Sequence, residues 1–257
     1  HRSTEGRGAH RGRSEPCIPI DAGIVRRMGE TLRIIEVNRI AKHIKENLGS
    51  YYPAGEVAAF TRIIATEILG IPQMTFFLKD NIELTHEQEA TLEDAIKRLQ
   101  KYEPIQYIQG YSDFCGLRFK VTPATLIPRP ETSELVEWVA SEATGNERIL
   151  DIGTGSGCIA VSLAYKMPQS KVTAWDISNE ALAVATENSR SNGTEVLFEQ
   201  VDILSYRPEE NLFDIIVSNP PYIKENEKSA MHSNVLDWEP HTALFVPDSD
   251  PLLFYRT

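Results

Sequence analysis

Cysteine, paired histidines and long apolar runs are scarce in this sequence, and each scarcity excludes a class of protein. The chain has three cysteines among 257 residues, Cys17, Cys115 and Cys158. Their odd number and wide spacing exclude a disulfide framework and a cysteine-type metal pair, and favour a reducing compartment. The six histidines show no HxxxH or HxH spacing, so we expect no metal site. No run approaches the roughly 18 consecutive apolar residues of a membrane span, which argues against an integral membrane protein.

Positive charge is scarce outside the N-terminal segment. The net charge is −11, yet residues 1–27 hold six arginines against three acidic residues, so the remainder carries −14. A duplex-binding protein usually presents a basic face, because phosphate contacts dominate its affinity. The acidic remainder therefore argues against nucleic acid as the main ligand. A composition of 41% hydrophobic and 25% charged residues is that of a globular chain of one or two domains.

Residues 1–27 are rich in Gly, Arg, Ser and Pro and show no periodicity. We expect a disordered extension of upstream or added sequence. No apolar h-region follows the arginines, so we do not expect this segment to be a secretory signal. An organelle transit peptide is the alternative, favoured by the arginines and disfavoured by Glu5, Glu15 and Asp21.

The next part of the chain predicts a small helical bundle. Apolar residues recur at helical spacing in 30–48, 54–69 and 86–101, and Thr85 with Gln88 forms a capping box before the third helix. Three short amphipathic helices must bury their stripes together, which gives a bundle over residues 28–103.

The pattern then changes to a β-hairpin and linker, and afterwards to strands that alternate with helices. Glycines interrupt the apolar residues of 104–130, and prolines stiffen its end. Alternation of strands and helices implies a parallel sheet with helices on both faces, an α/β fold over 131–257. After a helix at 132–143 we expect strands at 148–152, 171–175, 195–201 and 213–217, separated by helices near 158–166 and 179–191.

The first motif is a glycine loop, DIGTGSG, at residues 151–157. It lies between a predicted strand and a predicted helix, and Asp176 ends the following strand. A carboxylate there can accept both hydroxyls of a nucleotide ribose. The GxGxG spacing resembles the S-adenosylmethionine loop of Rossmann-like methyltransferases more than a dinucleotide loop.

The second motif is Asn219-Pro220-Pro221-Tyr222, directly after a predicted strand. Ligands of doubly wound sheets lie at the carboxyl ends of the strands, so this position favours a functional site. Two prolines fix the backbone, and the Asn219 side chain and the Pro220 carbonyl can then hold both hydrogens of a planar NH2 group while Tyr222 covers its face. Hydrogen bonds of this kind strengthen as charge develops on the nitrogen in a transition state.

With these motifs the chain resembles the HemK-type family of protein-(glutamine-N5) methyltransferases, over roughly residues 28–257. The resemblance implies S-adenosylmethionine as cofactor, the glutamine of the Gly-Gly-Gln motif in peptide-chain release factors as methyl acceptor, and substrate recognition by 28–103. The matching segments are 104–110 (PIQYIQG), 126–132 (LIPRPET), 151–157, Asp176, Asp202, 219–222, 238–240 (WEP) and Ala243 with Leu244.

The resemblance also implies a role for each matched residue. Asp176 would bind the ribose, and Asp202 with Ile203 would lie beside the adenine. The catalytic residues would be Asn219, Pro220 and Tyr222, with Pro221 also binding the glutamine amide and Asn219 also near the cofactor. The methionine part of the cofactor would lie against Gly153, Thr154, Gly155, Ser156 and Gly157.

The resemblance leaves further expectations and alternatives. The family's sheet has the strand order 3-2-1-4-5-7-6 and this sequence supplies four strands, so we expect a fragment of a longer protein. We expect a cytoplasmic monomer, with an organelle as the alternative, and neither nucleic acid nor membrane as partner. The competing functions are an amino-group methyltransferase acting on DNA or RNA and a truncated, non-catalytic binding module.

Overall fold

The computed structural model describes residues 24–27, 30–207 and 212–256, and for 24–36 it describes the backbone alone. The chain divides into two compact units, one up to Glu93 and one from Asp94 onward. In the described ranges, no helix is both long enough and apolar enough to cross a membrane.

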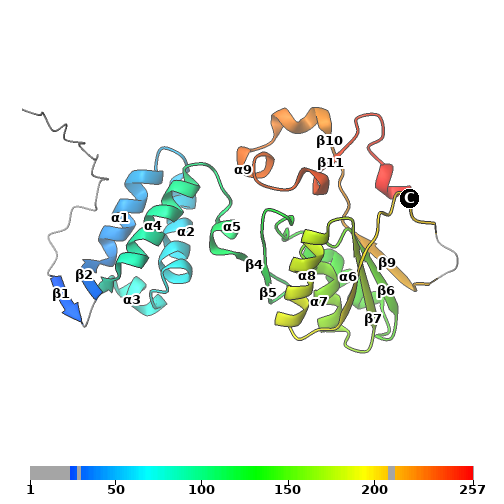
Figure 1. The fold of residues 1–257 in the computed structure, drawn as a ribbon, viewed down its shortest axis with the longest axis horizontal. Helices are drawn as coiled ribbons and strands as arrows, with labels where there is room; N and C mark the ends of the chain where they lie inside the picture. Colours follow the sequence, from blue (N-terminus) through cyan, green and yellow to red (C-terminus); the bar gives the residue numbers. More distant parts are fainter. Residues whose placement is uncertain (1–23, 28–29, 208–211, 257) are drawn as a thin grey trace, which may run out of the picture. The chain divides into compact units, whose positions relative to one another are not determined.

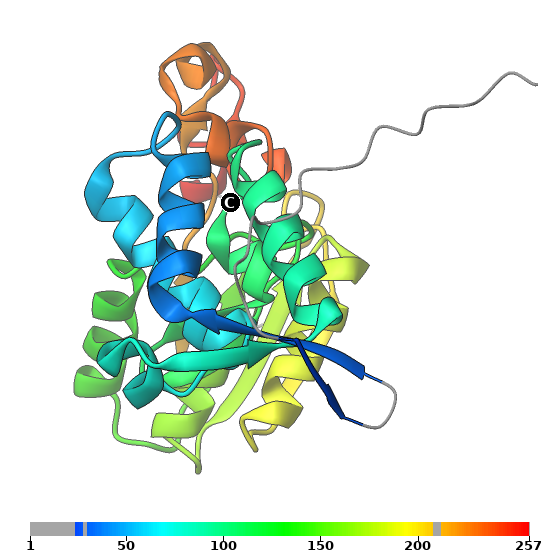
Figure 2. The same ribbon diagram turned by 90° about the vertical axis from the view of Figure 1, so that its left-hand side faces the viewer.

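The first unit combines helices with a three-stranded antiparallel sheet of order β1-β2-β3 (Figures 1 and 2). Helix α1 buries Val37, Ile40, Ile44 and Leu48, the stripe that its apolar spacing predicts. Helix α2 continues as a π-helix, η1. The elements are β1 (Ile24–Arg27), β2 (Glu30–Glu36), α1 (Val37–Leu48), α2 (Ala54–Ile63), η1 (Ile64–Ile68), α3 (Gln73–Leu78), β3 (Asn81–Leu84) and the start of α4 (His86–Leu99).

Two expectations about this unit are wrong. The helix predicted over 30–48 begins only at Val37, because Glu30–Glu36 pairs with both β1 and β3 as the central strand. Residues 1–27 are not all extension, because Ile24–Arg27 forms β1; residues 1–23 lie outside the described part of the chain. Cross-strand hydrogen bonding overrides the helical spacing here, since the segment 30–36 contains Thr and Ile residues that suit strands equally well.

The predicted capping box at the start of α4 is confirmed. The Thr85 N–H donates to Gln88 Oε1 (3.0 Å), and the Gln88 N–H donates to Thr85 Oγ1 (3.1 Å). Gln88 Nε2 also donates to the Leu69 carbonyl (2.8 Å), so the same side chain ties α4 to the residue that follows η1.

After the last residues of α4, the second unit continues with a short helix, α5 (Ile105–Gln109), and the hairpin of β4 (Tyr111–Phe114) and β5 (Leu117–Lys120). The hairpin is confirmed, but Tyr107 and Ile108 lie on the helix and not on a strand. Pro104 starts that helix and Gly110, at φ +84°, ends it. A proline just before a helix and a left-handed glycine just after it are typical helix boundaries.

A four-stranded parallel sheet of order β8-β7-β6-β9 forms the centre of this unit (Figure 1). That order is 3-2-1-4 in chain sequence, so the expected Rossmann-like fold class is confirmed. Helix α7 packs against both α6 and α8, and the three cover one face of the sheet. The elements are α6 (Thr132–Glu142), β6 (Arg148–Ile152), α7 (Cys158–Lys166), β7 (Lys171–Asp176), α8 (Asn179–Ser191), β8 (Val196–Gln200) and β9 (Ile215–Ser218).

We expected helices on both faces of the sheet. Among the described residues, helices cover only one face. Alternate residues of β8 and β9 pack against the core under α6, α7 and α8. Their neighbours on the opposite face, Leu197 and Ile216, are 58% and 64% exposed. Short elements complete the chain: β10 (Ile223–Lys224), η2 (Glu225–Ala230), α9 (Ser233–Leu236), η3 (His241–Ala243), β11 (Phe245–Val246) and η4 (Leu253–Tyr255).

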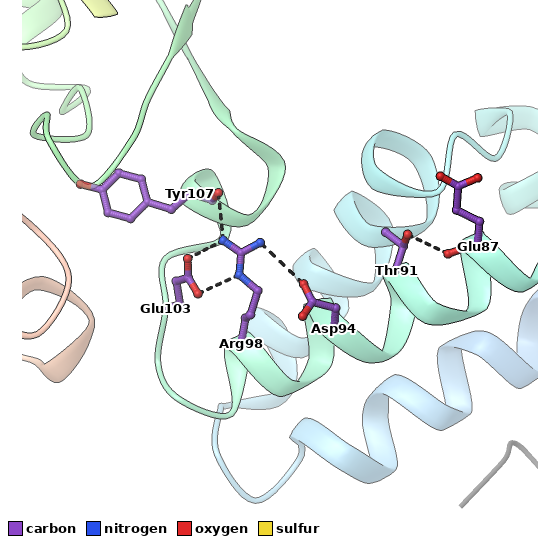
Figure 3. Close-up of polar contacts among 6 residues, drawn as sticks. All are labelled: Glu87, Thr91, Asp94, Arg98, Glu103 and Tyr107. Atoms are coloured by element: carbon purple, nitrogen blue, oxygen red, sulfur yellow. Dashed lines mark hydrogen bonds and ion pairs between the residues drawn. The ribbon is translucent and has the colours of Figure 1, made fainter. Parts of the chain in front are cut away.

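Arg98, in the last turn of α4, organises the turn into α5 (Figure 3). Its Nε and Nη2 donate to the two carboxylate oxygens of Glu103 (2.8 and 2.5 Å), and Nη2 also donates to the Tyr107 carbonyl (3.3 Å). The Glu103 side chain is buried, so its charge depends on this bidentate pair.

We predict that Arg98→Met destabilises the protein by about 2–3 kcal/mol, because it leaves the Glu103 carboxylate buried without a cation. The value lies below that of a fully buried pair because Arg98 is 34% exposed. Urea unfolding measures the change. The double variant Arg98→Met/Glu103→Gln should lose less than the sum of the single variants, and additive losses would show that the two side chains do not act together.

Candidate functional site

The ends of the four parallel strands bring the predicted motifs to one edge of the sheet. Ile152 pairs with Ser218, and the Ser218 hydroxyl donates to the Ile152 carbonyl (2.8 Å). The glycine loop and the Asn219 motif therefore leave adjacent strands side by side. On the other side, Asp176 pairs with Gln200 and its carbonyl accepts from the Val201 N–H (3.0 Å), which brings the segment after β8 to the same edge.

The glycine loop needs its glycines for backbone conformation. Gly153, Gly155 and Gly157 have φ values of +72°, +55° and +79°, where an L side chain is strained. A Cβ at Gly153 or Gly155 would meet no atom within 4 Å, so the loop borders open space there. A Cβ at Gly157 would instead approach Ala185 Cβ to 3.0 Å, so this glycine also permits close packing on α8.

Four N–H groups of the loop, those of Gly153, Thr154, Gly155 and Gly157, are already engaged inside the protein. A phosphate-binding loop works by the opposite arrangement, with free N–H groups that converge on the anion. The loop therefore suits a ligand without phosphate at this position. The bonds run from Gly153 and Thr154 to the Trp175 carbonyl (2.9 and 3.0 Å), from Gly155 to Asp176 Oδ2 (2.8 Å) and from Gly157 to the Thr154 carbonyl (2.8 Å).

Asp151 lies beneath the loop with its side chain fully buried. Its Oδ2 accepts from the Thr154 hydroxyl (2.6 Å) and from the Ala160 N–H (3.2 Å), whereas Oδ1 has no hydrogen-bond partner among the described residues. Burial raises the pKa of the Asp151 carboxyl to about 7. The two hydrogen bonds lower this pKa and the nearby Asp176 carboxylate raises it, but burial has the largest effect. An orphaned acceptor of this kind suits a cationic ligand.

Asp176 and the segment after β8 form the next part of the edge. Besides Gly155, the Asp176 carboxylate accepts from the Ser178 N–H through Oδ1 (2.9 Å), and its half-buried oxygens keep further lone pairs for ligand hydroxyls. Asp202 is exposed and stabilises a turn by accepting from the Leu204 N–H (3.0 Å); Ile203 beside it is half-buried.

The Asn219 side chain has a defined neighbour. Its Nδ2 donates to the hydroxyl of Thr132 at the start of α6 (3.4 Å), which leaves Oδ1 as the acceptor for a ligand. Pro220 is buried and Pro221 half-buried, whereas the Tyr222 side chain is 61% exposed. The backbone of the motif is thus fixed in the protein, and its aromatic ring is accessible.

The linker before α6 is tied to the segment that follows the motif. Arg129 forms an ion pair with Glu239 (2.6 Å), and the other carboxylate oxygen of Glu239 accepts from the Ile127 N–H (3.3 Å). The Glu239 side chain is 1% exposed. Burial and the Glu239 charge raise the pKa of Tyr107, whose hydroxyl donates to the Thr125 carbonyl (2.7 Å). Arg129 therefore has a structural partner on the protein itself.

Three residues that the sequence analysis did not assign belong to this site: Asp151, Thr132 and Asn188, which binds the Ser156 carbonyl (2.8 Å). A signal existed for Asn188, because it interrupts the apolar stripe of α8 at a buried position.

The described residues contain no cluster of His, Cys, Asp and Glu able to hold a metal. Burial raises the pKa of Cys158 to about 12, so its thiol stays protonated.

Two family descriptions match the chain. The PrmC N-terminal domain matches residues 42–110, and the methyltransferase small domain matches residues 131–237. A release factor glutamine methyltransferase of Bacteroides thetaiotaomicron is 50% identical over 221 residues, which are 86% of this chain and 80% of that protein. This chain belongs to the release factor glutamine methyltransferase family.

A second relative agrees with this assignment. The release factor glutamine methyltransferase of Flavobacterium psychrophilum is 45% identical over 81% of this chain and 75% of its own length. Among solved structures, the hMettl16 catalytic domain in complex with the MAT2A 3′UTR hairpin 6 aligns at 17% identity, with a TM-score of 0.43, over 68% of this chain and 63% of that one. That likeness adds nothing to the assignment.

The site fits S-adenosylmethionine, the cofactor of this family of methyltransferases. Open space lies along Gly153 and Gly155, and four of the loop N–H groups are occupied, which suits a ligand without phosphate. Two carboxylates, Asp151 and Asp176, suit a ligand that carries cationic groups and ribose hydroxyls.

We predict that Asp151 makes the stability of the cofactor-free protein depend on pH. Its folded-state pKa of about 7 lies above the unfolded value of about 3.9, so folding takes up a proton between them. The stability that Asp151 contributes should be fully present below about pH 4 and should be lost as the pH rises to about 7. Urea unfolding across this range should show a flatter profile for Asp151→Asn. Glu180→Gln, on the exposed surface of α8, is the charge-matched control, and parallel profiles for Asp151→Asn and the parent would contradict the prediction.

Proposed function

We propose that this chain transfers the methyl group of S-adenosylmethionine to the side-chain amide nitrogen of the glutamine in the Gly-Gly-Gln motif of peptide-chain release factors. The observation that carries the proposal is that the Asn-Pro-Pro-Tyr motif, 219–222, lies beside the glycine loop because β6 pairs with β9. Family membership, at 50% identity to a release factor glutamine methyltransferase, supports the same acceptor.

In this proposal the glycine loop and the strand ends hold the cofactor. Residues 153–157 line its methionine part, Asp176 accepts hydrogen bonds from the ribose, and Asp202 with Ile203 lies beside the adenine. When bound, S-adenosylmethionine supplies an electrophilic methyl group on a positively charged sulfur. The Asp176 carboxylate places negative charge close to this position, and Asp151 adds to it when ionised, which favours a cationic ligand.

The acceptor amide is held by Asn219 and Pro220. Asn219 Nδ2 donates to Thr132, so Oδ1 is turned toward the substrate and accepts one amide N–H, while the Pro220 carbonyl accepts the other. An amide nitrogen is a poor nucleophile because its lone pair is delocalised. Two fixed acceptors orient the nitrogen, and they bind it more strongly as positive charge develops there. Tyr222 covers the face of the amide.

The residues at the motif explain how the reaction proceeds without a strong base. The acidity of the amide N–H groups rises as the nitrogen becomes positive, so the proton is lost after the nitrogen has reacted and can pass to solvent. Catalysis then rests on alignment and on hydrogen bonds that strengthen in the transition state. A histidine or lysine as general base is not needed for this sequence of events.

A nucleic acid is the second candidate acceptor, because the Asn-Pro-Pro-Tyr motif also occurs in enzymes that methylate amino groups of DNA and RNA. The charge of −14 over residues 28–257 disfavours it. We further propose that the protein acts as a monomer in the cytoplasm, where the reduced state that its three separated cysteines favour is maintained.

We predict that the purified chain transfers label from S-adenosylmethionine to a release factor, and that changing the Gly-Gly-Gln glutamine of that factor to alanine abolishes the transfer. The measurement is incorporated radioactivity, with duplex DNA and RNA as parallel acceptors. Transfer to nucleic acid, or labelling that persists in the altered factor, would refute the proposal. Cofactor binding with no transfer to any acceptor would favour the alternative that the chain is a non-catalytic binding module.

We predict that two substitutions in the site separate binding from catalysis. Asn219→Ala should lower kcat about 10²–10³-fold and leave cofactor affinity nearly unchanged, because its bond to the acceptor strengthens only in the transition state. Asp176→Ala should do the reverse and weaken cofactor binding by about 1.5–3 kcal/mol, as for a lost hydrogen bond to a charged group. Calorimetry gives the affinities, and initial rates give kcat.

Thr132 provides the matched control. Thr132→Val keeps the shape and removes the hydroxyl that orients Asn219, so it should lower kcat in the same sense as Asn219→Ala by a smaller factor, about tenfold. Thr132→Ser keeps the hydroxyl and should keep the rate.

Equal cofactor affinity in Asp176→Ala and the parent would show that the ribose site is misplaced.

A further inference from the structure

Asn188 is a buried polar residue in the interior of a helix, and its amide is fully used. The residue is 1% exposed and lies in α8 on the buried stripe that contains Ala181 and Ala185. Its Oδ1 accepts from the Lys120 N–H (2.7 Å), and its Nδ2 donates to the Lys120 carbonyl (3.0 Å) and to the Ser156 carbonyl (2.8 Å).

These three hydrogen bonds join segments that are distant in sequence. Lys120 is the last residue of β5, and Ser156 belongs to the glycine loop. Asn188 therefore connects the hairpin to the loop through α8, and Figure 1 shows the hairpin beside that helix. One turn earlier, Ala185 packs against Gly157 so closely that a Cβ on the glycine would lie 3.0 Å from Ala185 Cβ.

The contact fixes the peptide plane between Ser156 and Gly157. Its carbonyl is held by Asn188, and its N–H donates to the Thr154 carbonyl (2.8 Å). Both ends of the peptide are thus restrained, so the plane cannot rotate without breaking a buried hydrogen bond. Because this peptide closes the loop whose glycines border the open space, its orientation sets the wall against which the cofactor lies.

The contact also requires an amide. The Lys120 N–H needs an acceptor, and two carbonyls need donors, all away from water. A primary amide supplies one acceptor atom and two N–H donors without charge, whereas a carboxylate has no donor and an alkyl side chain has neither. The charged side chains of Lys120 and of Glu187, the residue before Asn188, pair with each other on the surface (2.7 Å).

We propose that Asn188 is a positioning residue for the cofactor, which acts by holding the Ser156–Gly157 peptide and coupling it to the end of the hairpin. The inference rests on the proposed function for its cofactor. A residue that merely fastened the hairpin to α8 would affect stability and leave cofactor affinity alone.

Asn192, the residue that caps the C-terminal end of the same helix, is the matched control. It lies one turn after Asn188, and its Nδ2 donates to the Arg118 carbonyl of the same strand (2.9 Å) and to the Asn188 carbonyl (2.9 Å). It thus fastens β5 to α8 at a more exposed position, and its side chain has no bond to the glycine loop in the described structure. Asn188→Ala and Asn192→Ala therefore separate fastening of the hairpin from positioning of the loop.

The experiment measures the Kd of S-adenosylmethionine by calorimetry for the parent and both alanine variants, at a temperature well below the Tm of each. We expect Asn188→Ala to raise the Kd about tenfold or more and Asn192→Ala to change it less than about twofold. An unchanged Kd in Asn188→Ala, or an equal rise in Asn192→Ala, overturns the proposal.

Asn188→Asp tests the proposal even where the alanine variant fails to fold. A protonated carboxyl donates to one carbonyl and accepts from the Lys120 N–H, whereas an ionised carboxylate faces two carbonyl oxygens. The Kd of Asn188→Asp relative to the parent should therefore rise with pH, and that of Asn192→Asp should stay constant. Taking the ratio at each pH removes effects of Asp151 and Asp176, which both proteins share. A ratio for Asn188→Asp that does not change with pH overturns the proposal.

The outcome is separable from that of the proposed function, because cofactor affinity is measured without any methyl acceptor. If the parent binds S-adenosylmethionine but labels no release factor, the proposed acceptor is refuted. The Kd ratios of the Asn188 variants still decide whether Asn188 positions the cofactor. A parent that does not bind S-adenosylmethionine refutes both.

Discussion

The hydrogen bond from the Gly155 N–H to the Asp176 carboxylate joins the two strands on which the site depends. It turns the glycine loop toward β7, and it occupies an N–H that would otherwise face the ligand. The same carboxylate accepts from Ser178 at the start of α8, so the loop, the strand end and that helix share one acceptor group. The parallel register of β6 with β9 then places the Asn219 motif beside the glycine loop.

Much of the α/β half could be predicted, because its element boundaries are marked locally. The glycine loop ends β6 and starts α7, and Ser178 caps α8 by accepting from the Ala181 N–H (3.2 Å). The strand at Glu30–Glu36 could not be predicted in this way. Its apolar residues have a spacing that also fits a helix, and the pairing with β3 that decides between them comes from 81–84, far along the chain.

The candidate site shows the same division between local and distant information. The glycine loop and the Asn219 motif are contiguous in sequence, so spacing alone indicated both. Thr132 and Asn188 act through partners 87 and 68 residues away. A polar residue within the apolar stripe of α8 marks Asn188 as unusual, but no local pattern identifies the partner of either residue. Asp151 is adjacent to the loop in sequence, but only the fold shows that one of its oxygens is buried without a partner.

The occupied N–H groups of the glycine loop have a consequence for selectivity inside a cell. Adenosine triphosphate and the nicotinamide dinucleotides share the adenosine group with S-adenosylmethionine and compete for any site that recognises that group alone. Here the phosphates would meet a loop whose N–H groups at Gly153, Thr154, Gly155 and Gly157 are engaged, with the Asp176 carboxylate close by. Repulsion and unpaired phosphate oxygens both weaken such binding, so we expect the site to favour a ligand without phosphate over these nucleotides.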